Sequence, residues 1–400
     1  MSENLKYWLW LQKALGEGAY IKSIIEDFGS VKNLYESNIL EWRMSSSLTA
    51  KQIDRLEQTD INSVNEIIYN CERNSWQMVD YDDDLYPERL REIINPPAVL
   101  YIDGAFPDID NSALIGIVGT RKASDYAIKV THIMSRGCAE AGVVVVSGGA
   151  LGVDTAAHKG AIMAGGKTIA VLGCGFGTNY LYANRDLREA IKANGALVTE
   201  YPPFTQARRD TFPMRNRLIS ALSVGVLVVE AGVKSGSLIT ANYALEQGRD
   251  VFAIPASVLS LNFAGTNKLI DDGAMVATKP IHLVAPYAAR FDSLDITKVR
   301  TVDEYIYDTS DKGANIPEKA LPSFDNTDRD REKRAEKEDA ANKLSGDMKT
   351  VYQYLGSSFE HIDLITRATG LAGSRVMVAL TQLELMELAE STSGKRYKKS

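Results

Sequence analysis

The central part of the chain alternates between short apolar runs and segments in which apolar residues recur at helical spacing. The apolar runs cover 114–118, 143–147, 168–172, 196–200, 224–230, 251–254 and 275–278. The helical segments between them cover 125–141, 154–164, 183–194, 214–222, 236–247 and 265–272. Continuous apolar strands are buried on both faces, and strands that alternate with helices form mostly parallel sheets. The pattern therefore predicts an α/β fold with a doubly wound, mostly parallel sheet at residues 113–290.

Smaller regions precede this sheet. Residues 1–70 carry two apolar helical stripes separated by Gly16-Glu17-Gly18, which is typical of small helical modules of the SAM or helix-hairpin-helix type. The pattern leaves open whether this module contacts DNA or serves as a cap or dimerisation module. Residues 71–112 are predicted to be a connector of extended segments that packs on the sheet, because their prolines limit helix formation.

The composition changes again after the predicted sheet. Residues 291–345 include the almost wholly charged run 328–334 and indicate a charged linker. Residues 346–400 carry three short helical patterns and a basic tail at 395–399, which together resemble a winged helix-turn-helix. Winged helices bind either DNA or proteins, so both roles stay open for this domain.

Composition restricts the class of protein. The 3 cysteines, Cys71, Cys138 and Cys174, are widely separated, which fits a reducing cytosol better than a disulfide framework or a zinc site. With only 4 histidines, no histidine-based metal site is expected. No apolar run reaches membrane-spanning length. We therefore expect a soluble, cytoplasmic protein without a metal or a membrane contact.

The distribution of charge matters more than its total. The chain has a net charge of −7 at pH 7, which by itself argues against nucleic acid as a ligand. Between residues 113 and 284, however, 17 lysines and arginines face 12 aspartates and glutamates, which makes this region +5 and the remainder −12. A basic central domain inside an acidic chain still binds a polyanion locally.

Small residues follow the first two strands of the predicted sheet. Gly119-Thr120-Arg121 comes after the first strand, and Ser147-Gly148-Gly149-Ala150 comes after the second. The carboxyl ends of parallel strands meet at one edge, and glycine turns beside helix N-termini present N–H groups to phosphate. The guanidinium of Arg121 suits phosphate oxygens, although a solvated arginine and a plain tight turn are the alternative interpretations.

The most basic segment is predicted to begin the fourth helix. Residues 206–217 contain four arginines and one acidic residue, interleaved with Phe212 and Asn216. Arginine combined with aromatic residues is the composition of grooves that bind single-stranded nucleic acid. The segment therefore favours a polymeric anion as ligand.

Further groups are expected at the same edge. Tyr180, Asn184 and Arg185 lie near the start of the third helix, where Tyr180 is either a stacking aromatic or an ordinary core residue. The loop at 173–177 lacks the full G-x-G-x-x-G spacing, so no dinucleotide cofactor is expected.

Glu230 would be the acid or base of an alternative function, a Rossmann-type hydrolase of nucleoside monophosphates. The four arginines exceed the need of one phosphate, which favours the polymer.

Five motifs, taken in order, are similar to those of the DNA-processing protein A family, also called DprA or Smf. They are IVGTRKAS, SGGALGVDTAAHKGA, FPMRNRLIS, VVEAGVKSGSLITANYALEQGR and GTNKLIDDGA. The resemblance covers about residues 5–290 and implies an extended Rossmann fold with a helical N-terminal domain and, in many members, a C-terminal winged helix. The sequence departs from the family after the third strand, where Gly177 and Leu181 replace the usual Asp and Pro.

The resemblance also implies a function. Members of this family bind single-stranded DNA without marked sequence preference, act as homodimers, and load the recombinase RecA onto strands that enter during natural transformation. We therefore predict a non-enzymatic, cofactor-free protein that protects incoming single strands and loads RecA. The expected DNA contacts are Arg121, Ser147, Gly148, Gly149, Ala150, Asn184, Arg185, Phe212, Arg215, Asn216 and Arg217.

Overall fold

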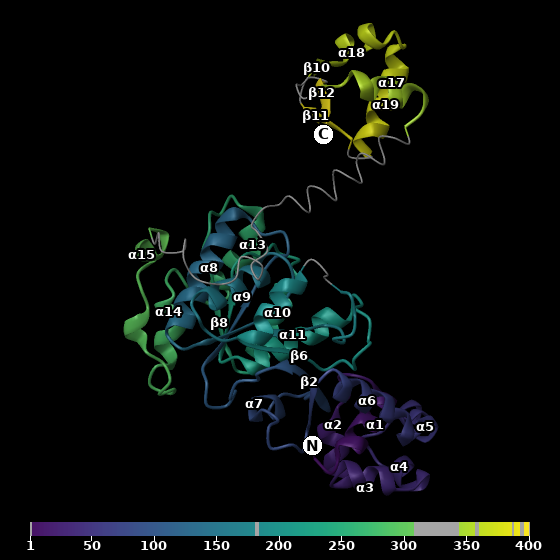
Figure 1. Cartoon of the computed structure of the whole chain (residues 1–400), viewed down its shortest axis with the longest axis vertical. Coiled ribbons are helices and arrows are strands. Elements are labelled where there is room, and N and C mark those ends of the chain that lie inside the picture. The colour runs from purple at the N-terminus through teal and green to yellow at the C-terminus, as the bar shows by residue number, and fades with distance from the viewer. Residues whose placement is uncertain are drawn as a thin grey trace. The chain divides into compact units, whose positions relative to one another are not determined.

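The computed structural model describes residues 2–180, 184–307, 344–356, 360–385, 388–392 and 396–399. The described residues up to 307 form one compact unit, and those from 344 form a second one (Figure 1). Residues 181–183 and 308–343 are outside the described part, so most of the predicted charged linker is too.

A mixed sheet organises the first unit. In the described residues it has nine strands in the order β1-β2-β6-β5-β4-β3-β7-β8-β9. The strands are β1 (Gln77–Asp80), β2 (Val99–Gly104), β3 (Leu114–Val118), β4 (Val144–Ser147), β5 (Thr168–Val171), β6 (Gly195–Thr199), β7 (Gly225–Val228), β8 (Asp250–Ala253) and β9 (Met275–Val276). From β6 to β9 all neighbours are parallel, whereas β2 pairs antiparallel with β6 and β1 antiparallel with β2. The predicted mostly parallel sheet is confirmed.

Helices cover both faces of this sheet, because the strands are apolar on both sides. Along β3, Leu114 and Val118 belong to one core cluster, while Ile115 and Ile117 belong to the other. The first face is covered by α11 (Thr211–Leu222), α12 (Gly236–Glu246) and α13 (Ala264–Asp271). The second is covered by α8 (Asp125–Glu140), α9 (Val153–Met163), α10 (Arg185–Ala193) and α14 (Ile281–Val284). The predicted doubly wound arrangement is thus confirmed.

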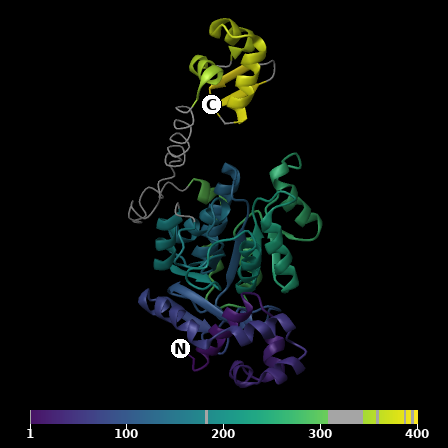
Figure 2. The same ribbon diagram turned by 90° about the vertical axis from the view of Figure 1, so that its right-hand side faces the viewer.

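A helical module precedes the sheet, as predicted. Its elements are α1 (Leu5–Leu15), α2 (Ile21–Phe28), α3 (Val31–Glu36), α4 (Ile39–Met44), α5 (Ala50–Gln58), η1 (Ile61–Val64) and α6 (Asn65–Arg73). Trp8, Trp10 and Trp42 fill its core, which is continuous with Tyr101 of β2. Figure 2 shows the module, in purple, packed at the β1–β2 end of the sheet. The segments predicted as a connector therefore extend the sheet, with α7 (Glu88–Arg91) between β1 and β2.

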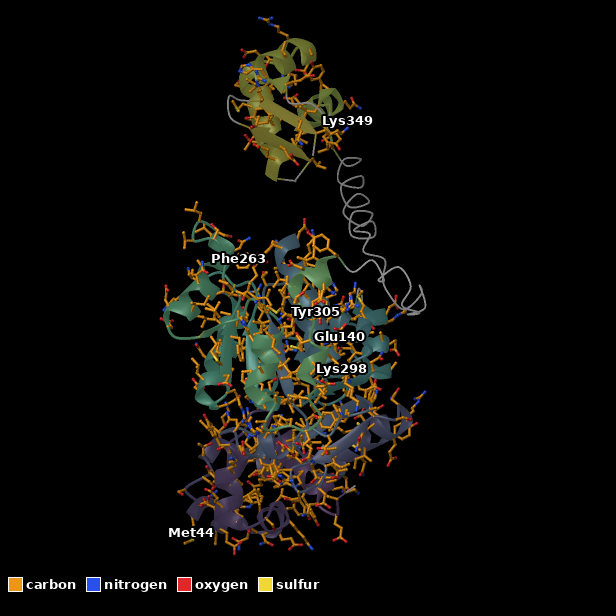
Figure 3. The ribbon with its side chains drawn as sticks, turned by 90° about the vertical axis from the view of Figure 1, so that its left-hand side faces the viewer. Met44, Glu140, Phe263, Lys298, Tyr305 and Lys349 are labelled. Atoms are coloured by element: carbon orange, nitrogen blue, oxygen red, sulfur yellow. The ribbon has the colours of Figure 1, made fainter. Side chains whose placement is uncertain are left out.

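The end of the first unit folds back onto α8. It consists of η4 (Ala285–Tyr287), η5 (Ile296–Lys298) and α15 (Val302–Ile306). The Tyr305 hydroxyl donates to Glu140 Oε2 over 2.7 Å, and Figure 3 labels both side chains. Arg136 and Arg300 also contact the Glu140 carboxylate. This cluster fastens residues up to Ile306 onto the Rossmann-like unit.

The second unit has the arrangement of a winged helix, as predicted. Three helices, α17 (Gly346–Tyr354), α18 (Ile362–Thr369) and α19 (Gly373–Leu385), pack around Val351, Ile365 and Leu380. The strands β10 (Glu360–His361), β11 (Ala389–Thr392) and β12 (Arg396–Lys399) form an antiparallel sheet in the order β10-β12-β11. Among the helices described in both units, none is long and apolar enough to span a bilayer.

Candidate nucleic-acid interface

The carboxyl ends of β3, β4 and β5 lie side by side and lead into loops rich in small residues. We call the loops at 119–124, 148–152 and 173–180 the glycine edge. The Thr120 N–H donates to the Glu230 carbonyl over 2.9 Å, and the Val153 N–H donates to the Thr120 carbonyl over 3.2 Å. These bonds hold the first loop between the end of β7 and the start of α9. This is the edge of an open α/β sheet where ligands bind.

Arg121 is an exposed cation that stacks on an aromatic ring at this edge. Its guanidinium lies 4.8 Å from the centre of the Phe212 ring, while the side chain stays exposed. The Tyr180 ring is 5.1 Å from the Phe212 ring. Among the described residues, Arg121 forms no ion pair. A stacked guanidinium keeps its in-plane N–H donors available, so Arg121 is placed to meet an anion from solvent.

In the predicted anion loop at 147–150, some positions already form hydrogen bonds within the protein and others do not. Ser147 is buried and its hydroxyl donates to the Ile117 carbonyl over 2.7 Å. The Ala150 N–H donates to Asp154 Oδ2 over 3.3 Å. In the part of the chain that the structure describes, no hydrogen bond engages the N–H groups of Gly148 and Gly149. These two amides are the unpaired donors of the loop, although both glycines are buried.

Arg215 lies underneath this loop rather than on its surface. Its side chain is only 4% exposed, and Nη1 donates to the Gly148 carbonyl over 2.8 Å and to the Val171 carbonyl. A Cβ atom on Gly148 would come within 2.5 Å of Arg215 Nη2, so only glycine fits above it. Burial lowers the pKa of Arg215 and raises the pKa of the neighbouring Asp154. Arg215 therefore positions the loop from below.

Arg217 has a different location from the one predicted. It is 4% exposed, and its Nη2 lies 2.6 Å from Oε2 of Glu200, which is 1% exposed. Gln12 of the helical module donates to the Glu200 carbonyl over 2.8 Å. Residues two apart on a helix point in different directions, so Arg215 and Arg217 do not share a face. The ion pair leaves Arg217 out of the set of exposed phosphate ligands.

The other expected contacts also separate into exposed and buried groups. Asn184 is 5% exposed, and its Nδ2 lies 3.1 Å from both the Gly149 carbonyl and Thr155 Oγ1. Arg185 begins α10 and is exposed, with Nε 3.7 Å from Asp186 Oδ1. Asn216 is half-buried and donates to the Gly236 carbonyl over 3.3 Å. Asn184 and Asn216 thus join neighbouring elements, and Arg185 faces solvent.

Glu230, the acid or base of the alternative hydrolase, is held in place. Its side chain is 1% exposed, and Oε2 accepts hydrogen bonds from the Ser124 N–H over 2.8 Å and the Ser124 hydroxyl over 3.0 Å. Ser124 caps α8, so the carboxylate secures the start of that helix. The described residues also contain no cluster of three or more histidine, cysteine, aspartate or glutamate side chains that would hold a metal ion.

Comparison with known proteins follows the same division into domains. Residues 77–287 match the sequence model of the family described as DNA recombination-mediator protein A, and residues 335–395 match that of the DprA winged helix domain. Protein Smf of Synechocystis sp. is 31% identical over 401 residues, 98% of each chain. DNA processing protein DprA of Bacillus subtilis is 44% identical over 189 residues, which are 47% of this chain and 64% of the relative. The X-ray structure of DNA processing protein A from Streptococcus pneumoniae is similar with a TM-score of 0.61 and 34% identity, over 70% of this chain and 96% of that one.

Proposed function

Because this chain belongs to the DNA recombination-mediator protein A family, we propose that it binds single-stranded DNA along the glycine edge. Arg121, Arg185 and the amides of Gly148 and Gly149 hold phosphates in this proposal. Arg215, Asn184 and Asp154 keep those groups in position from below. The protein acts by binding rather than by catalysis, protecting the strand and presenting it to the recombinase RecA.

The observation that carries the proposal is the exposed stack of Arg121 on Phe212 at the same edge as the Gly148–Gly149 amides. A guanidinium and two backbone amides recognise phosphate oxygens, which every nucleotide presents. None of these groups distinguishes one base from another. The arrangement therefore favours binding without sequence preference, as expected of a groove for single strands.

The alternative, hydrolysis of a nucleoside monophosphate, needs a carboxylate that reaches the substrate. Glu230 is the candidate, and both hydrogen bonds from Ser124 engage its Oε2. Its other oxygen, Oε1, is buried without a hydrogen-bond partner among the described residues, and the side chain is only 1% exposed. A carboxylate that is buried in this way does not reach a substrate at the surface, which favours a binding function over hydrolysis at this edge.

The assembly and the partner follow from the family resemblance. We propose a homodimer, because two glycine edges on one strand raise the effective concentration of the second contact. The residues outside 113–284 carry a net charge of −12, which is compatible with a basic protein partner, and we propose that this partner is RecA.

The proposal is tested by binding of labelled oligo-dT and of a matched duplex across a range of salt. For single strands the slope of log affinity against log salt is about −0.7 per neutralised phosphate. We expect Arg121→Ala/Arg185→Ala to weaken oligo-dT binding and to reduce the slope by about 1.4, the sum of two contacts. The matched control is Arg43→Ala/Lys51→Ala, which removes two exposed charges from the helical module and is expected to bind like the wild type.

Two results would contradict the proposal. One is oligo-dT binding that is unchanged in Arg121→Ala/Arg185→Ala. The other is release of free base or phosphate from nucleoside monophosphates that disappears in Glu230→Gln, which would establish the hydrolase instead.

A further inference from the structure

The loop from Tyr201 to Asp210 exposes an aromatic ring and a cation that the proposed phosphate site does not use. Phe204 is 54% exposed, although it follows a buried strand of the sheet. Arg209 is exposed, and no ion pair engages it among the described residues. Its neighbour Arg208 is different, because it contacts the Asp210 carboxylate over 3.1 Å and 3.2 Å. One free cation thus lies close in sequence to one exposed ring.

The Phe204 ring has a fixed support. A Cβ atom on Gly177 would come within 2.3 Å of Phe204 Cε1, so only glycine allows the ring to lie this close to the backbone. Two backbone hydrogen bonds join the two loops, from the Gly177 N–H to the Pro203 carbonyl over 2.7 Å and from the Gly175 N–H to the Thr205 carbonyl over 2.9 Å. The ring therefore belongs to a braced surface rather than to a free hairpin.

The same loop connects Phe204 with the glycine edge. A Cβ atom on Gly173 would come within 2.9 Å of the Phe212 ring, and Gly177 occupies the corresponding position beside Phe204. Gly173 and Gly177 are four residues apart, so their Cα atoms are separated by at most about 14 Å. The two aromatic side chains thus lie along one short stretch of backbone.

The two rings differ in what they can still bind. Phe212 is half-buried and already contacts both the Arg121 guanidinium at 4.8 Å and the Tyr180 ring at 5.1 Å. A base that stacks on Phe212 would therefore compete with these two groups for the ring. Phe204 keeps more than half of its surface open to solvent.

We propose that Phe204 is a stacking platform for an unpaired nucleobase and that Arg209 binds a phosphate next to it. The inference rests on the proposed function, and it extends the path of the strand from Arg121 across the 173–178 loop. Every base has a π-face, so the platform adds affinity without sequence preference. In a duplex the base faces are covered by their neighbours, so this contact favours single strands over double strands.

The test uses the full chain, oligo-dT, and an abasic strand of the same length. We expect Phe204→Ala to weaken oligo-dT binding by about 5- to 150-fold, the range that loss of one stacked base gives. Binding of the abasic strand and the salt slope are expected to stay as in the wild type, and Phe204→Trp is expected to keep the affinity for oligo-dT. Arg209→Ala is expected to reduce the salt slope by about 0.7. Its matched control is Arg208→Ala, which is expected to leave the slope unchanged because Asp210 already neutralises Arg208.

The outcomes separate this inference from the proposed function. If Phe204→Ala binds oligo-dT like the wild type while Arg121→Ala loses affinity, the platform is overturned and the function stands. Equal loss of affinity for oligo-dT and for the abasic strand also overturns the platform, because the ring would then act only through the shape of the loop. If Arg121→Ala has no effect either, the proposed function itself fails.

Discussion

Two layers of the same edge use arginine in opposite ways. The outer layer, which we call the rim, consists of Arg121, Arg185 and Arg209, all of which are exposed. The inner layer, which we call the floor, includes Arg215 and Arg217, each of which is only 4% exposed. The rim arginines present their charge to solvent. The floor arginines bind internal acceptors instead: Arg215 binds backbone carbonyl oxygens, and Arg217 binds the Glu200 carboxylate.

The difference shows that the number of arginines in a segment overstates the number of phosphate contacts. Residues 206–217 contain four arginines, of which Arg215 and Arg217 are internal and Arg208 is paired with Asp210. Only Arg209 remains for a polyanion from this segment. Buried arginines determine the shape of the edge, and exposed arginines determine its affinity and its response to salt.

The largest effect that we expect is on stability and comes from the floor. Arg217→Ala leaves the Glu200 carboxylate buried without its cation, so the free energy of unfolding should fall by about 3–5 kcal/mol. Urea unfolding of the full chain measures this loss. The matched control is Arg208→Ala, which removes an exposed ion pair and should change stability by about 0–1 kcal/mol. Equal effects of the two substitutions would remove the distinction between floor and rim.

The second expected effect is a pH dependence of stability that arises from His158, a buried residue of α9. His158 is fully buried, its Nδ1 lies 2.8 Å from Thr168 Oγ1, and burial lowers its pKa from 6.5 to about 3. The unfolded chain therefore binds a proton below pH 6.5 that the folded chain does not. The contribution of neutral His158 to the free energy of unfolding is fully present above pH 6.5. It is lost as the pH falls toward 3.

Between pH 7 and pH 5 this loss should be about 2 kcal/mol, since each pH unit of such a titration is worth about 1.4 kcal/mol. Urea unfolding at a series of pH values measures it. His158→Gln removes the titrating group, so its stability should vary less steeply over the same interval. An identical slope for the variant and the wild type would show that His158 is not the source.

Much of this fold follows from pattern alone, because the central strands are buried on both faces and their apolar runs are unbroken. The expected run at 114–118 coincides with β3, and that at 168–172 differs from β5 by a single residue. β1 and β2 are harder to identify as strands of the sheet. They flank the proline-containing segment at 87–97, and the bonds that place β2 in the sheet are to β6, which is almost one hundred residues away.

The candidate site is predictable only in outline. The small residues after β3 and β4 locate the edge, since parallel strands end together. Burial within the edge depends on which side of α11 packs against the sheet, and the sequence of that helix does not reveal it. The interaction of Glu230 with Ser124 likewise joins groups 106 residues apart, and no local spacing signals it. Phe204 is missed for the same reason, because its exposure depends on how two loops pair.

The smallest effects that we expect distinguish two neighbours in sequence, Asn184 of the floor and Arg185 of the rim. Asn184→Ala removes hydrogen bonds from a buried amide to Gly149 and Thr155 and should lower stability by about 1–3 kcal/mol. Arg185→Ala should change stability by less than about 0.5 kcal/mol, because the side chain is exposed.

In DNA binding the two variants should differ in how the affinity for oligo-dT depends on salt. Arg185→Ala should reduce the salt slope for oligo-dT by about 0.7, the value of one phosphate contact. Asn184→Ala should weaken binding at every salt concentration without changing the slope, since it disturbs the loop and removes no charge. Titrations of both variants at four salt concentrations, alongside their urea unfolding curves, give the comparison. A slope that changes in Asn184→Ala and stays constant in Arg185→Ala would reverse the assignment of the two layers at this position.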